Sequence, residues 1–146
     1  MSNGNPKPSV DFDGTWYNQH DSKMELRVDK TGSVAGRYAT GVGAPKKEEW
    51  FPLLGFASGD QLSFTVNFGK YGSLTAWVGQ QTTDADNNAR IVTFWHLTQN
   101  IPDIEEPKKL WATVQTGSDI FTRNAPSSKN VAVLFARPSH PVRATR

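Results

Sequence analysis

The stretch that best indicates the fold is Lys23-Met24-Glu25-Leu26-Arg27-Val28-Asp29-Lys30-Thr31-Gly32, which has the pattern of a strand followed by a turn. Met24, Leu26 and Val28 fall on one face of an extended chain, whereas the charged residues between them fall on the other. This period of two predicts a β-strand with one face buried and the other in water. The last four residues suit a tight hairpin turn, in which Gly32 supplies the positive φ.

The same pattern recurs along the chain. Phe64, Val66 and Phe68 alternate with polar residues, and further turns are indicated at 58–60 and 84–88. Strands are predicted near 13–19, 22–29, 33–40, 50–57, 61–69, 73–81, 89–98 and 111–122. Short strands at even spacing with hairpin connections are typical of an up-and-down barrel or a sandwich, and no convincing helical period is present. The longest irregular connections, 41–49 and 99–110, are of a kind that tends to be functional or mobile.

Composition narrows the class of protein. A chain of 146 residues, 36% of them hydrophobic, suits one ordinary domain, and its apolar runs are too short to span a membrane as helices. The absence of Cys excludes disulfides and thiolate metal sites. The net charge is only +2 and the basic residues are scattered, which argues against a nucleic-acid partner.

The two ends of the chain differ from its middle. We expect a flexible N-terminal segment (1–12), a barrel (13–123) and a C-terminal tail (124–146). The N-terminal segment lacks the basic start and apolar stretch of a signal peptide, so either the protein is cytosolic or a signal was removed and a start Met added. The apolar Val131–Ala136 leaves two alternatives for the tail: it is loose, or it packs on a barrel surface or into a neighbour's open site.

Catalytic and metal motifs are not found. The three His residues lack metal-ligand spacing, and no Gly-x-Ser-x-Gly motif is present. The pairs Glu48-Glu49 and Glu105-Glu106 are expected on a solvated surface, because adjacent residues in a loop point apart. Asp119 as an acid or base would lack a second catalytic partner at a recognisable spacing. We therefore predict neither an enzyme nor a metal site.

Tryptophans and polar residues recur on the strands. Trp16, Trp77, Trp95 and Trp111 lie within predicted strands or at their starts. Polar residues fall on what look like the same faces: Asn18, Ser22, Tyr38, Thr40, Ser73, Thr75 and Asp119. One interpretation is a Trp-filled core with polar rims. The other is a site for one small amphipathic molecule, since a barrel of eight strands can hold such a ligand.

These segments resemble the avidin/streptavidin family. The resemblance is carried by Gly14–Gln19 with Ser22–Met24, Gly36–Tyr38, Ser73–Gln80, Thr93–Leu97, and Trp111 followed by Asp119, so it spans about 13–123. It implies an eight-stranded antiparallel up-and-down β-barrel that binds biotin without enzymatic activity and needs no cofactor. It also implies a homotetramer, with Trp111 lent to a neighbouring subunit's site.

The resemblance assigns a role to each candidate biotin-binding residue. Asn18, Ser22 and Tyr38 would donate to the ureido oxygen, and Asp119 would accept from a ureido N–H. Thr75 would face the thiophane sulfur, and Ser73 would meet the carboxylate. The remaining positions would be apolar walls or lid residues: Phe68, Trp77, Trp95, Leu97, Thr40 and Ala44.

Some positions depart from the family pattern. Phe68 stands where Trp is frequent, and His20 replaces a more usual apolar residue. Gln99 takes the place of a small polar residue near the carboxylate, and Gln115 that of an apolar residue. These differences bear on the strength of binding and on carboxylate recognition. A lipocalin-like barrel carrying another apolar ligand is the main alternative, and a structural role through the sheet surfaces is a further one.

Overall fold

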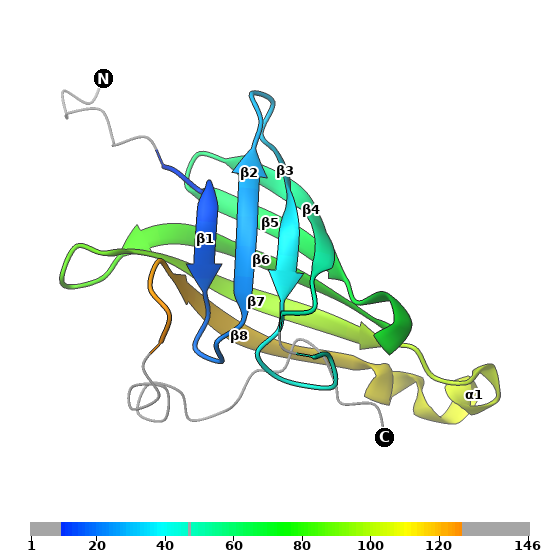
Figure 1. The fold of residues 1–146 in the computed structure, drawn as a ribbon. Coiled ribbons are helices and arrows are strands. Elements are labelled where there is room, and N and C mark those ends of the chain that lie inside the picture. Colours follow the sequence, from blue (N-terminus) through cyan, green and yellow to red (C-terminus); the bar gives the residue numbers. More distant parts are fainter. Residues whose placement is uncertain (1–9, 47, 127–146) are drawn as a thin grey trace.

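The computed structural model describes residues 10–46 and 48–126, which form one closed barrel of eight antiparallel strands (Figure 1). Each strand pairs with the next along the chain, and β8 returns to β1. The strands are β1 (Gly14–Tyr17), β2 (Lys23–Val28), β3 (Ser33–Ala39), β4 (Phe51–Ser58), β5 (Gln61–Asn67), β6 (Ser73–Thr83), β7 (Ala89–Gln99) and β8 (Val114–Thr122). The prediction of an up-and-down barrel is confirmed, and the sandwich alternative was wrong.

Because of the alternating sequence pattern, every second side chain of a strand points into the barrel. Met24 and Leu26 are buried, and so are Phe64 and Val66, whereas the residues between them face outward. Gly32 takes the positive φ expected at the β2–β3 turn, at 87°. Burial of one face of every strand supplies the main driving force for closing the sheet.

The connections at the two ends of the barrel differ in length. Tight turns join β2–β3, β4–β5 and β6–β7 at one end. The other end, called the open end below, collects the connections 18–22, 40–50, 68–72 and 100–113 (Figure 1). The last of these contains η2 (Asp103–Glu105), α1 (Glu106–Lys109) and η3 (Leu110–Thr113), and η1 (Gly69–Tyr71) lies in the third. The open end therefore has the longer chain segments available to shape a site.

The predicted eighth strand, 111–122, was wrong at its start. Trp111 lies in η3, and β8 begins at Val114. The Thr113 hydroxyl donates to the carbonyl oxygen of Leu110 at 2.6 Å and so closes the helical turn. The strand predicted over 61–69 was also too long, because Phe68 leads into η1.

The seam between β1 and β8 depends on side chains. Among the described residues one aligned pair, Tyr17 with Thr122, joins these strands, while β6 and β7 pair along their whole length. The Arg123 guanidinium donates to the carbonyl oxygen of Asp13 at 2.8 Å and lies 3.7 Å from the Trp16 ring. Gln19 crosses the same seam, since its Oε1 accepts from the backbone N–H of Ile120 at 3.1 Å. Two side chains thus complete the closure that the short β1 leaves unfinished.

Residues 1–9 of the predicted N-terminal segment and residues 127–146 of the predicted tail, including Val131–Ala136, lie outside the described residues. Within the described ranges, no helix is long and apolar enough to cross a membrane.

Candidate ligand-binding site

Asn18 lies at the β1–β2 connection with its amide orientation fixed. Its Oδ1 accepts from the backbone N–H groups of His20 and Ser22, both at 2.9 Å. Because two donors occupy the oxygen, the Nδ2 group points the other way, toward the Tyr38 hydroxyl at 3.4 Å. The tight loop therefore presents an N–H donor in the barrel interior.

Ser22 and Tyr38 add two hydroxyl groups beside Asn18. Both residues are fully buried. Ser22 Oγ accepts from the backbone N–H of Gly41 at 3.0 Å, which leaves its hydrogen to be donated elsewhere. Burial and the nearby charge of Asp119 hold the pKa of Tyr38 well above its ordinary value. Tyr38 consequently keeps its proton at neutral pH and can act as a donor.

Asp119 reaches the interior from β8 and is held from two sides. Its Oδ1 accepts from Gln19 Nε2 and its Oδ2 accepts from Trp77 Nε1, both at 2.8 Å. The carboxyl group is fully buried. A carboxylate can accept about four hydrogen bonds, so these two positioning bonds are compatible with a further acceptor role toward a ligand.

Aromatic rings form the wall beside these polar groups. Trp77 stacks on Phe64 with ring centroids 4.9 Å apart, and Tyr38 packs against Trp77 at 5.1 Å. Trp95 lies across from Gly117 on β8, where a Cβ atom would come within 2.3 Å of the indole ring. The missing side chain of Gly117 therefore makes room for the Trp95 indole beside β8.

The remaining candidates lie toward the open end. Ser73 and Thr75 on β6 and Leu97 on β7 are all buried, and Phe68 is buried just after β5. Thr40 is also buried, but its hydroxyl is engaged locally, since it donates to the carbonyl oxygen of Val42 at 2.8 Å. Apart from Thr40, these side chains come from β6, β7 and the residue after β5, on the far side of the sheet order from Asn18, whose connection 18–22 lies at the same open end.

The connection 40–50 is anchored at its far end by Glu49. The Glu49 Oε2 atom accepts from the Tyr71 hydroxyl at 2.7 Å, and Oε1 lies 2.9 Å from Lys70 Nζ. Hydrogen bonds from Tyr71 and Lys70 lower the pKa of Glu49 to about 2. The expectation that Glu48 and Glu49 are simply solvated was wrong for Glu49, which accepts from Tyr71 and Lys70 of η1 and also from the backbone N–H of Lys46 at 3.1 Å. Ala44, in the same connection, is half-buried.

Trp111 is the candidate that lies farthest from a buried position. Its side chain is 82% exposed on η3. Ile104 and Leu110 in the same connection are also exposed. The described residues of a single subunit therefore leave an apolar segment uncovered beside the open end.

The geometry as a whole suits a ligand with a carbonyl-type oxygen, an adjacent N–H group and an apolar body. Three donors lie at one place (Asn18 Nδ2, the Ser22 hydroxyl and the Tyr38 hydroxyl), the Asp119 carboxyl group supplies an acceptor, and aromatic rings line the wall. No group of three or more His, Asp or Glu side chains is placed to hold a metal ion within residues 10–46 and 48–126.

Comparison with known proteins identifies the family. Residues 7–124 match the Avidin family. This chain belongs to the avidin family. The resemblance inferred from the sequence motifs is thereby confirmed.

Two curated members of the avidin family and two solved structures illustrate the similarity. The chain is 32% identical over 116 residues to Avidin-related protein 4/5 of Gallus gallus, covering 75% of each chain. It is 30% identical over 118 residues to Avidin of Gallus gallus, covering 75% of this chain and 76% of that protein. The barrel also matches the crystal structure of xenavidin, with a TM-score of 0.70 and 24% identity over 80% of this chain and all (100%) of the other. A rhizavidin–biotin complex matches with a TM-score of 0.63 and 28% identity over 75% of this chain and 96% of the other.

Sequence reasoning missed three residues that shape the site. Gln19 orients Asp119 from a position 100 residues away in the chain, which no local pattern reveals. Gly117 accommodates Trp95 across two strands, and Glu49 anchors the loop near Thr40 and Ala44. A period-two reading that placed Asp119 inward would also place Gly117 inward, which is the one signal that was available.

Proposed function

We propose that this protein binds biotin tightly in the barrel interior and that it acts as a binding protein rather than as an enzyme. The observation that carries the proposal is the convergence of Asn18, Ser22 and Tyr38, with Asp119 held close by. The ureido oxygen of biotin would accept from the three donors, and one ureido N–H would donate to Asp119. Membership of the avidin family, and the similarity to a protein solved as a biotin complex, support the same ligand.

Complementarity explains why such a site would be selective. Buried donors and acceptors that a ligand satisfies are not penalised on binding, whereas an analogue that leaves one unpaired loses about 1–3 kcal/mol. The thiophane ring and the aliphatic chain would pack against Trp77, Trp95, Phe68 and Leu97, with Thr75 near the sulfur. Thr40 and Ala44 would lie at the rim. Phe68 keeps the wall apolar but offers less area than a Trp side chain would.

Calorimetric titration with biotin tests this proposal. Asp119→Ala should weaken binding by at least tenfold, because it removes the acceptor and leaves Trp77 Nε1 without the partner that positions it. Asp60→Ala, a change at the opposite end of the barrel, is the matched control and should leave the affinity unchanged. If the wild-type protein binds no biotin while it binds another apolar ligand, the lipocalin-like alternative takes its place.

We also infer a homotetramer, from two exposed apolar surfaces. The first surface is a row of cross-strand neighbours on β4, β5, β6 and β7, which are Phe56, Ser63, Val78 and Phe94. Its three apolar side chains, Phe56, Val78 and Phe94, are 71%, 62% and 68% exposed. The second surface is the segment that carries Trp111. Exposed apolar patches of this kind mark interfaces, and two self-complementary faces on one subunit generate four subunits with closed symmetry.

Analytical ultracentrifugation tests the assembly. The wild-type protein should sediment as a tetramer, Val78→Glu should reduce it to a smaller species, and Thr82→Glu is a control on the same strand. Trp111→Lys should weaken the subunit contact made by the segment that carries Trp111. It should also speed the dissociation of biotin, because Trp111 is expected to close a neighbouring subunit's site. A wild-type monomer would refute the inference.

A further inference from the structure

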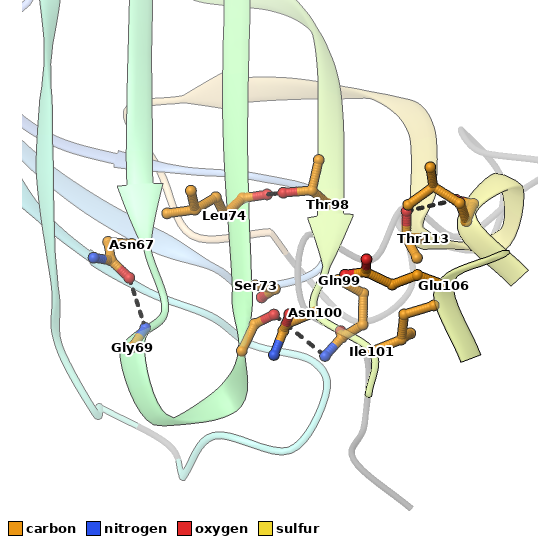
Figure 2. Close-up of a pocket in the computed structure, with 12 residues that line it drawn as sticks. Asn67, Gly69, Ser73, Leu74, Thr98, Gln99, Asn100, Ile101, Glu106 and Thr113 are labelled. Carbon is orange, nitrogen blue, oxygen red and sulfur yellow. Dashed lines mark hydrogen bonds between the residues drawn. The ribbon is translucent and has the colours of Figure 1, made fainter. Parts of the chain in front are cut away.

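Two buried polar atoms at the open end have no hydrogen-bond partner in the structure: Ser73 Oγ and Gln99 Oε1. Ser73 is only 4% exposed. The two residues are direct cross-strand partners at the ends of β6 and β7, and Figure 2 shows their side chains close together. A buried polar atom without a partner costs free energy, so this pair calls for a ligand that supplies what is missing.

The orientation of the Gln99 amide is fixed by its neighbours. Its Nε2 group donates to the carbonyl oxygens of Tyr71 and Gly72, at 3.2 and 3.4 Å. Carbonyl oxygens can only accept, so the amide cannot be turned over without losing both bonds. Gln99 Oε1 is therefore an acceptor that needs a donor, whereas the Ser73 hydroxyl can donate.

A free carboxylate does not match this pair. It could accept from Ser73, but it has no hydrogen to give to Gln99 Oε1, and two acceptor oxygens would face each other. A secondary amide matches both groups, because its carbonyl oxygen accepts from Ser73 and its N–H donates to Gln99. Glu106, which lines the adjoining groove, adds a negative charge that also disfavours a carboxylate.

We propose that the preferred ligand is biotin joined through an amide, the form it takes on a lysine side chain, and that Gln99 is the residue that selects it. This inference rests on the proposed biotin site and names the chemical class of its ligand. The chain attached to the amide nitrogen would continue into the groove outside Ser73 and Gln99. That groove has a volume of about 460 Å³ and is lined by Asn67, Leu74, Thr98 and Ile101 among others (Figure 2).

Three small ligands separate the possibilities: biotin, biotin N-methylamide and biotin methyl ester. The amide and the ester have the same shape and are both uncharged, but only the amide carries the N–H group. Competition against labelled biotin should show the amide bound about tenfold tighter than the ester by the wild-type protein, as expected for one unpaired buried acceptor.

Gln99→Met tests the role of the side chain while keeping its length. The ratio of amide affinity to ester affinity should fall to near one. The two ligands differ in hydration, but that difference is the same for both proteins, so it cancels when the two ratios are compared. Gln81→Met is the matched control, because Gln81 Oε1 is likewise a buried atom without a partner but lies at the other end of β6. That variant should keep the wild-type ratio.

Each outcome has one meaning. The wild-type protein should also bind the amide more tightly than free biotin. Equal binding of amide and ester, or tighter binding of free biotin than of the amide, overturns the inference and leaves the biotin site standing, and these comparisons need no variant to fold. A ratio that Gln99→Met leaves unchanged overturns the role of Gln99. If none of the three ligands binds, the proposed function fails, and the inference fails with it.

Discussion

Gln19→Leu is the change that most sharply tests how the barrel is closed and how its polar site is held. The Gln19 side chain donates to Asp119 Oδ1 at 2.8 Å and to the carbonyl oxygen of Ser118 at 3.2 Å, and it accepts from Ile120 N at 3.1 Å. Leucine fills a similar volume but makes none of these bonds. The variant should leave the interior packed while it removes the polar link between β1 and β8.

The size of the effect follows from the bonds lost. A hydrogen bond to a charged group contributes about 1.5–3 kcal/mol, and an orphaned buried N–H costs about 1–3 kcal/mol. Some of this is offset by burial of the apolar leucine side chain, so we expect a net loss of about 2–4 kcal/mol of unfolding free energy. For a domain of this size that corresponds to a fall in Tm of roughly 5–15 °C.

Thermal unfolding followed by circular dichroism, without ligand and at one protein concentration, measures this loss. Gln61→Leu, at an exposed position on β5, is the matched control and should change Tm by less than about 2 °C. A loss for Gln19→Leu no larger than that of the control would refute the account of the seam. Biotin affinity should fall in the same variant, because Asp119 loses one of its two positioning bonds.

Three other groups of contacts, at Arg123, Glu49 and Gly117, can be tested in the same way. Arg123→Met should cost about 1–3 kcal/mol in chemical denaturation through loss of the guanidinium bonds across the seam, and no loss would contradict this role. Glu49→Gln should lower Tm at neutral pH; because the folded-state pKa is lowered from 4.5 to about 2, the deficit should persist above pH 4.5 and vanish as the pH falls toward 2. Glu48→Gln is its control, with a longer 3.6 Å ion pair, and an equal effect there would be contrary to the account. Gly117→Ala should displace the Trp95 indole and weaken biotin binding in a titration, whereas unchanged affinity would remove Trp95 from the wall.

Much of the barrel was predictable because each strand signals itself locally. The alternation in 23–28 and the Gly in 29–32 depend only on neighbouring residues, and both appear where they were expected. The start of β8 was not predictable in this way. The segment around Trp111 carries the apolar and β-branched residues of a strand, but a side-chain bond from Thr113 closes a helical turn there instead.

In the candidate site, too, local motifs predicted some residues, whereas contacts between distant parts of the chain could not be predicted. Asn18, Ser22, Tyr38 and Asp119 were named from motifs, and the structure brings them together in the interior, although their roles toward biotin remain predictions. Contacts that depend on barrel closure could not be read from the sequence. Gln19 meets Asp119 only because β8 returns to β1, so its importance is a property of the closed fold.

Thermal unfolding with and without biotin is the measurement that decides whether the barrel interior is a biotin site. A ligand that binds only the folded state stabilises it by RT ln(1 + [L]/Kd), so about 100 μM biotin at a Kd of about 1 nM adds roughly 7 kcal/mol. We expect a rise in Tm of about 15–25 °C for the wild-type protein and a much smaller rise for Asp119→Ala. No rise in the wild-type protein, or an equal rise in both, would contradict the claim that Asn18, Ser22, Tyr38 and Asp119 form a biotin site.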